Sequence, residues 1–367
     1  MQKNEAAESV NLRGRVHAAW RTRACSAALA AGAQVFLLGS GVAMPLCLNS
    51  AWIASLAALP ACAAAVWACR RALLRGAEPK GGAEPLPYRV GYVLLALTLD
   101  TGAALALAAL VSLAEHALLT QAQTLWSAGA AFTAALLCAI SRSTGVSRLC
   151  FALRWALPLA VALLTAASFP SELPAGLFPL LGAGALPLGL SCICMLSSAL
   201  PVLMLLLPPP ELETIDGALR VDWIPDTRFF LRRVLTGAAS GCVMLFVLSV
   251  CSTYESIAAQ HTWGQRLRIL AQPREGVAQA LLAVCQLLAL LLLAASLLCA
   301  AEQALLRAQP ALARLRMGLL LPAAFLALCL LALIVSGLDK ALLIAPWLAL
   351  PGVLCLFLLR RRKENAP

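Results

Sequence analysis

Long, nearly uninterrupted blocks of apolar residues dominate the sequence. An apolar block of about 18 or more residues predicts a transmembrane helix, because roughly 20 helical residues cross the ~30 Å hydrocarbon core of a bilayer. In that core the backbone N–H and C=O groups must be paired within the protein, which favours helices. The sequence therefore predicts an all-α polytopic membrane protein with about ten transmembrane helices, at about 24–47, 50–69, 90–113, 124–141, 151–168, 183–207, 230–252, 277–299, 317–337 and 341–359.

The composition supports this class. Hydrophobic residues make up 62% of the 367 residues and charged residues only 12%, whereas a soluble domain carries roughly 25% charged residues. The predicted domains are an N-terminal tail (1–23), a transmembrane domain (24–359) and a C-terminal tail (360–367). The segments between the apolar blocks are too short for a separate soluble domain.

The basic residues predict the orientation. Lys and Arg concentrate in loops that stay in the cytoplasm. With the N-terminus inside, 24 of the 28 Lys and Arg residues fall in inner segments, so both termini are expected to be cytoplasmic. The net charge of +11 is spread over six inner segments without interleaved aromatics. This pattern predicts contact with anionic membrane lipid and no binding of nucleic acid.

No motif for catalysis, a cofactor or a metal is present. The sequence lacks an ATP-binding loop, an HExxH motif and a nucleophile elbow, so we expect no enzyme, no catalytic residue and no cofactor. The 14 cysteines lie almost entirely in apolar blocks, with no CxxC pair and no nearby histidine cluster. We expect them to act as small apolar side chains and not as metal ligands.

Two of the predicted helices contain residues that disturb a regular helix. The first contains Gly39, Ser40 and Gly41, which suit either close helix packing or an unwound stretch whose backbone groups bind a ligand. The apolar segment 177–207 is too long for one simple span and predicts an outer re-entrant turn before a broken sixth span. Its helix breakers and serines are Pro179, Gly182, Gly184, Pro187, Gly189, Ser191, Ser197, Ser198 and Pro201. Matching breaks in spans one and six are typical of a five-plus-five inverted repeat, as in LeuT-like transporters, with a binding site between the halves.

Polar groups in the middle of the third block form the other candidate site. Asp100 and Thr101 lie at membrane depth, where a carboxylate costs a few kcal/mol unless it is paired, hydrated or protonated. Asp100 is therefore expected to face the bundle interior. It is either a ligand or proton site or, when protonated, a partner in an interhelical hydrogen bond.

Several short stretches resemble the spore-germination permeases, the B subunits of nutrient germinant receptors in the amino acid/polyamine/organocation transporter superfamily. The resemblance rests on ten spans and on the motifs Asn49–Ala54, Gly145–Arg148, Pro179/Gly184/Pro187, Tyr254–Glu255 and the run from Arg266. The sequence departs from the family at Arg274–Glu275, where the order is reversed, and at the start of span six, where the usual acidic residue is absent.

The resemblance implies a receptor subunit in the inner membrane of the spore. It would bind a small nutrient germinant, such as an amino acid, and signal to A and C subunits. The expected ligand-binding residues are Gly39, Ser40, Gly41, Asp100, Thr101, Ser191, Ser197 and Ser198. Two alternatives stay open: a secondary amino acid transporter of the same fold, with Asp100 as a proton-coupling group, and a membrane anchor or sensor domain without a ligand of its own.

Overall fold

The computed structural model describes residues 2–76, 86–117, 124–140, 142–153, 184–209, 224–251, 277–314, 318–337, 342 and 345–359, and all regular structure in these ranges is helical. The first helices are α1 (Gln2–Leu38), the π-helical turn η1 (Gly39–Ala43), α2 (Met44–Cys47), the 3₁₀ turn η2 (Leu48–Ser50), α3 (Ala51–Ser55), α4 (Ala58–Gly76) and α5 (Leu86–Ala117). The central ones are α6 (Thr124–Ile140), α7 (Arg142–Leu153), α9 (Ala185–Met195), the 3₁₀ helix η4 (Leu196–Leu206) and α10 (Thr227–Cys251). The last are α13 (Val277–Ala308), α14 (Ala311–Arg314), α15 (Leu320–Ser336), η7 (Ala345–Leu348) and α17 (Ala349–Leu358).

The helices agree with the predicted membrane-spanning blocks. Within the described residues, six helices are long and apolar enough to cross a bilayer: Gly14–Cys47, Ala51–Leu74, Leu86–Glu115, Ala185–Leu206, Thr227–Ser249 and Val284–Ala308. The helix α6 and the shorter apolar helices Leu320–Ser336 and Ala345–Leu358 coincide with the predicted fourth, ninth and tenth spans. The predicted fifth span, the re-entrant turn before Gly184 and the C-terminal tail lie almost wholly outside the described residues.

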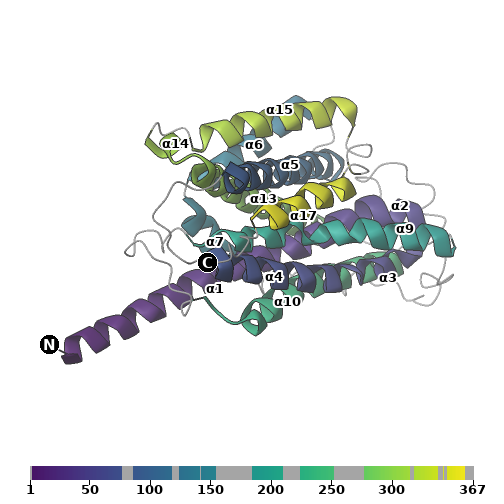
Figure 1. Ribbon diagram of the computed structural model, residues 1–367. Helices are drawn as coiled ribbons and strands as arrows, with labels where there is room; N and C mark the ends of the chain where they lie inside the picture. The colour runs from purple at the N-terminus through teal and green to yellow at the C-terminus, as the bar shows by residue number, and fades with distance from the viewer. Residues whose placement is uncertain are drawn as a thin grey trace.

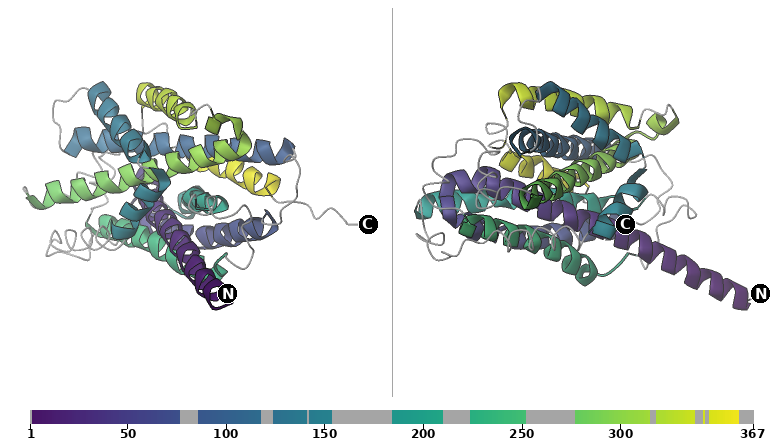
Figure 2. Two further views of the ribbon diagram at one scale, coloured as in Figure 1. Left: turned by 90° about the vertical axis from the view of Figure 1, so that its left-hand side faces the viewer. Right: turned by 180° about the vertical axis from the view of Figure 1, so that it is seen from behind.

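The tail predicted for residues 1–23 is helical from Gln2 onward and continuous with span one in α1. Its N-terminal end extends beyond the helix bundle (Figures 1 and 2). Because α1 is one continuous helix from Gln2 to Leu38, the part that extends beyond the bundle continues the axis of the first transmembrane helix.

The helices form two groups that pack against each other. One group holds α1, α3, α4, α9, η4 and α10, and the other holds α5, α6, α13 and α15, as the three views in Figures 1 and 2 agree. Spans that occupy equivalent places in the two halves of the chain are in contact: α1 packs on η4, α4 on α10, and α5 on α13. This pairing of spans one with six, two with seven and three with eight is what an inverted five-plus-five repeat predicts.

Small residues allow a very close helix contact between α1 and α10. A Cβ atom on Gly237 would lie 1.9 Å from the carbonyl oxygen of Ala28, and one on Gly32 would lie 2.5 Å from the carbonyl oxygen of Gly237. Only glycine fits at such a distance between backbones, as in the small-xxx-small contacts of membrane helices. The spacings Ala28–Gly32 and Gly237–Gly241 therefore define where spans one and seven cross.

Candidate functional site

Span one changes its helix type at the predicted Gly39-Ser40-Gly41 cluster. The chain forms a π-helical turn from Gly39 to Ala43, closed by a bond from the Met44 N–H to the Gly39 carbonyl, and all five residues are buried. The Ser40 hydroxyl donates to the Phe36 carbonyl at 2.7 Å. The backbone therefore stays helical at the predicted break but is wider than an α-helix, a feature frequent at functional sites. Span one ends at Leu48, whose φ of 53° turns the chain.

Span six also changes its helix type. It is α-helical from Ala185 to Met195 and then 3₁₀-helical from Leu196 to Leu206, with Pro201 inside the 3₁₀ stretch. Runs of 3₁₀ helix beyond three or four residues are uncommon and often mark a hinge or a strained sequence. The Ser197 and Ser198 hydroxyls donate at this transition to the carbonyls of Cys194 (2.7 Å) and Met195 (2.6 Å). Both serines thus support the change of helix type.

The two irregular segments meet. The turn η1 and the helix α2 both pack against α9. At this contact the Ser191 side chain is fully buried and interacts with the Cys47 thiol, but its oxygen makes no hydrogen bond of regular geometry to any described residue. The Cys47 thiol itself donates to the Ala43 carbonyl at 3.1 Å. A buried hydroxyl without a partner is costly in a folded protein, so Ser191 has hydrogen-bonding capacity available for a ligand.

Asp100 and Thr101 lie apart from this contact. Asp100 is on α5 with 2% of its surface exposed, and its Oδ1 atom has no hydrogen-bond partner among the described residues. It lies close to the Cys329 thiol of α15. A Cβ atom on Gly102, two residues along the helix, would meet Leu200 and Leu297. Since two residues turn a helix by about 200°, Asp100 points away from η4 and α13. The Thr101 hydroxyl donates to the Leu97 carbonyl at 2.8 Å.

The structure therefore separates the predicted ligand-binding residues into two places. Gly39, Ser40 and Gly41 in η1 and Ser191 in α9 belong to helices that pack on each other, with Ser197 and Ser198 at the following helix transition. Asp100 lies on α5 near the Cys329 thiol of α15, and Thr101 follows it on α5.

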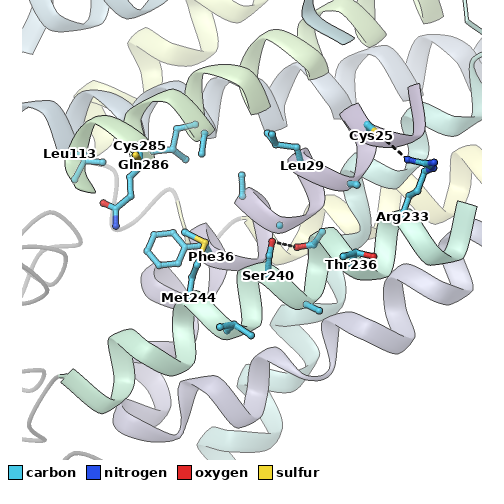
Figure 3. Close-up of a pocket in the computed structure, with 18 of the residues that line it drawn as sticks. Cys25, Leu29, Phe36, Leu113, Arg233, Thr236, Ser240, Met244, Cys285 and Gln286 are labelled. Carbon is cyan, nitrogen blue, oxygen red and sulfur yellow. Dashed lines mark hydrogen bonds between the residues drawn. The ribbon is translucent and has the colours of Figure 1, made fainter. Parts of the chain in front are cut away.

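A crevice of about 440 Å³ lies between α1, α10 and α13 (Figure 3). It runs beside the small residues of the α1–α10 contact, from Cys25 and Arg233 at one end to Leu113, Cys285 and Gln286 at the other. The sequence analysis did not predict it, because its walls belong to four spans far apart in the chain, α1, α10 and α13 with Leu113 of α5 at one end. The signal was indirect: Gly32, Gly237 and Ser240 lie on faces that contact another helix instead of lipid.

Polar side chains join the two helix groups near the basic end of the crevice. The buried Arg23 on α1 donates to Gln303 on α13. Three residues further along α1, the Ser26 and Ser296 hydroxyls lie 3.1 Å apart, and Ser296 also lies 3.7 Å from the Cys150 thiol of α7. These contacts connect spans one and eight, which belong to different groups. In the predicted orientation they lie toward the cytoplasm.

Known proteins resemble this chain in fold. No protein-family model and no curated protein matches the sequence. Among solved structures, a nucleobase-cation-symport-1 family transporter, Mhp1, in a closed conformation with bromovinylhydantoin bound, superposes with a TM-score of 0.59. It is 13% identical, and the match covers 92% of this chain and 77% of the transporter. A manganese transporter from Eremococcus coleocola matches with a TM-score of 0.54 and 15% identity, over 93% of this chain and 78% of that one.

The chain is thus an all-α polytopic membrane protein with a transporter fold. Both neighbours are membrane transporters and both are covered over most of their length. The TM-scores of 0.59 and 0.54 establish the architecture, whereas identities of 13% and 15% are too low to indicate the solute. The expected LeuT-like arrangement of the helices is confirmed at the level of the fold.

Proposed function

We propose that the protein binds a small polar solute, such as an amino acid, where span one meets span six. The observation that carries this proposal is the buried Ser191 hydroxyl, which lacks a partner among the described residues at the contact of α9 with α2 and η1. A solute with donors and acceptors would supply that partner. The fold adds support, because irregular helices at the centre of such transporters place backbone groups toward their substrates.

The chemistry of this contact suits a zwitterion better than an apolar solute. The π-helical turn has a wider ring of backbone hydrogen bonds than an α-helix. Gly39 and Gly41 bring no side chain of their own to this turn, and the Leu245 side chain of α10 packs against Gly39. Backbone groups of half-helix ends bind charged groups in such folds. Asp100, away from these residues, would serve to couple solute binding to a proton and not to hold the solute.

The response to the bound solute distinguishes a transporter from a receptor. The fold of the two neighbours supports transport, whereas the resemblance to spore-germination permeases supports a germinant receptor subunit. In the receptor, the solute would shift the equilibrium between two arrangements of the helix groups, and partner subunits would respond to that shift. In the transporter, the same shift would carry the solute across.

A thermal-shift panel of amino acids, sugars, nucleosides and nucleobases on the purified full chain tests solute binding. A solute at about 100 times its dissociation constant should stabilise the protein by ~2.7 kcal/mol. Gly41→Leu should abolish that shift by filling the turn η1. Gly189→Leu is the matched control, because Gly189 lies on span six with open space around its Cα. If no solute shifts the unfolding temperature, or if both variants respond like the wild type, the proposed site is wrong and the anchor role is favoured.

Two further readouts separate transport from sensing. Uptake of the bound solute into proteoliposomes under a pH gradient, lost in Asp100→Asn, would assign a proton-coupled transporter. Binding without uptake, together with a germination defect toward that solute in spores lacking the protein, would assign the receptor.

A further inference from the structure

We infer that the crevice between α1, α10 and α13 is a binding site for an anionic phospholipid. The site is distinct from the proposed solute site, since none of Gly39, Ser40, Gly41 or Ser191 lines it. It would take a lipid whose phosphate lies at Arg21 and Arg233 and whose acyl chain lies along the small residues of α1 and α10. Figure 3 shows Arg233 at the end of the crevice where the phosphate would lie.

The basic end of the crevice fits a phosphate. Arg21 and Arg233 both line it, and the ion pair found among the described residues, Arg70 with Asp226, involves neither of them. Arg21 lies over the Phe151 ring at 5.2 Å, and Arg233 lies over the Phe229 ring at 4.9 Å. A guanidinium that stacks by its face keeps N–H groups at its edge for a phosphate. One such group of Arg233 contacts the Cys25 sulfur at 3.2 Å, a weak acceptor that a phosphate would outcompete.

The middle of the crevice fits a hydrocarbon chain and not a polar solute. Its walls there are mostly Ala, Gly, Leu, Phe, Val and Met. The two hydroxyls in this stretch already bond to their own helix, Thr236 to the Arg232 carbonyl and Ser240 to the Gly237 carbonyl. A polar solute would therefore lose its hydrogen bonds to water without gaining partners in the crevice. An acyl chain has no such hydrogen bonds to lose.

The dimensions agree with one leaflet of a bilayer. Along α1 the lining residues extend from Arg21 to Phe36, which is about 22 Å at ~1.5 Å per residue. Half of the ~30 Å hydrocarbon core is about 15 Å, or about ten residues of α1, so an acyl chain that begins at the arginines fits within the crevice and ends near Gly32. Thr236 and the 54%-exposed Val243 stand at the rim, so a lipid can enter sideways from the membrane. The predicted orientation places the arginines in the cytoplasmic leaflet, where anionic lipids interact with basic pockets between helices.

Native mass spectrometry of the purified full chain, with equal amounts of phosphatidylglycerol and phosphatidylcholine, tests the site. The wild type should retain one phosphatidylglycerol in preference to phosphatidylcholine. Arg21→Gln and Arg233→Gln should each lower that occupancy about fivefold, as expected for one basic residue near an anionic lipid. Arg232→Gln is the matched control, since Arg232 is adjacent on α10 but does not line the crevice, and it should retain wild-type preference.

A second pair of variants tests the acyl-chain part. Ala239→Phe fills the crevice and should remove the retained lipid, whereas Ala64→Phe, on an exposed position of α4, should not. Equal retention of both lipids, or loss of lipid in neither arginine variant, would overturn the proposal. A dimer that Ala239→Phe abolishes would assign the crevice to a second copy of the chain. Loss of solute binding in that variant with lipid retained would assign it to the solute, and either outcome also overturns the proposal.

Discussion

Single hydroxyl groups in span six have different roles despite similar burial. Ser198 is fully buried and satisfied by the Met195 carbonyl, whereas Ser191 is fully buried and has no hydrogen-bond partner among the described residues. A buried polar group that lacks a partner costs about 1–3 kcal/mol. The two serines therefore differ in what the described part of the fold offers their hydroxyls, and the proposed solute would bind at Ser191.

Ser191→Ala should separate ligand binding from stability. If the hydroxyl serves the solute, the variant should bind it about fivefold more weakly, which corresponds to ~1 kcal/mol for one hydrogen bond. Without solute, the variant should unfold at the same temperature as the wild type or higher, because an unpaired group is removed. Calorimetric titration and thermal unfolding measure the two effects. Ser198→Ala is the control and should bind normally; equal affinity in Ser191→Ala would exclude a role in binding.

Among the helices, the crossing of α1 and α10 depends on glycine to an unusual degree. Gly237→Ala would place a methyl group 1.9 Å from the Ala28 carbonyl oxygen, so the two helices must separate. We expect a loss of unfolding free energy of about 1–3 kcal/mol, the range for overpacked cores. Gly129→Ala in α6 has open space at its Cβ and should be neutral or stabilising by ~0.5–1 kcal/mol. Unfolding in mixed micelles measures both; a similar effect of the two changes would contradict the close contact.

The sequence predicts those features that depend on residues close together in the chain, and it fails for those that depend on packing between distant spans. Apolar blocks locate the spans, because each transmembrane helix must by itself be long and apolar enough to cross the hydrocarbon core. Glycine and proline locate the irregular turns at Gly39–Gly41 and Pro201, since their backbone effects are local. The form of each irregularity, a π turn in one case and 3₁₀ helix in the other, depends on packing between spans. The inward direction of Asp100 was predicted, and the residue is buried. The crevice and the identity of the helix that Asp100 faces depend on the packing between spans, so the sequence alone did not reveal them.

The whole molecule consists of two helix groups connected by a small number of polar contacts among the described residues. The proposed solute site lies inside the group that holds α1 and α9, whereas Arg23–Gln303 and Ser26–Ser296 join α1 to α13 of the other group. Movement of one group against the other would have to exchange these contacts, which lie on one side of the bundle, near one end of α1. In the predicted orientation, that side is the cytoplasmic one.

The orientation makes a prediction about the entire chain. With 24 of 28 basic residues in inner segments, both ends should be cytoplasmic, which requires an even number of spans and hence a crossing at 151–168. A green fluorescent protein fused after residue 367 should fluoresce. Alkaline phosphatase fused to chains truncated after Leu153 should be inactive, and after Glu172 active, because only the second fusion lies beyond the fifth span. Inactive phosphatase at both positions would show that this block does not cross, and the C-terminus should then lie outside.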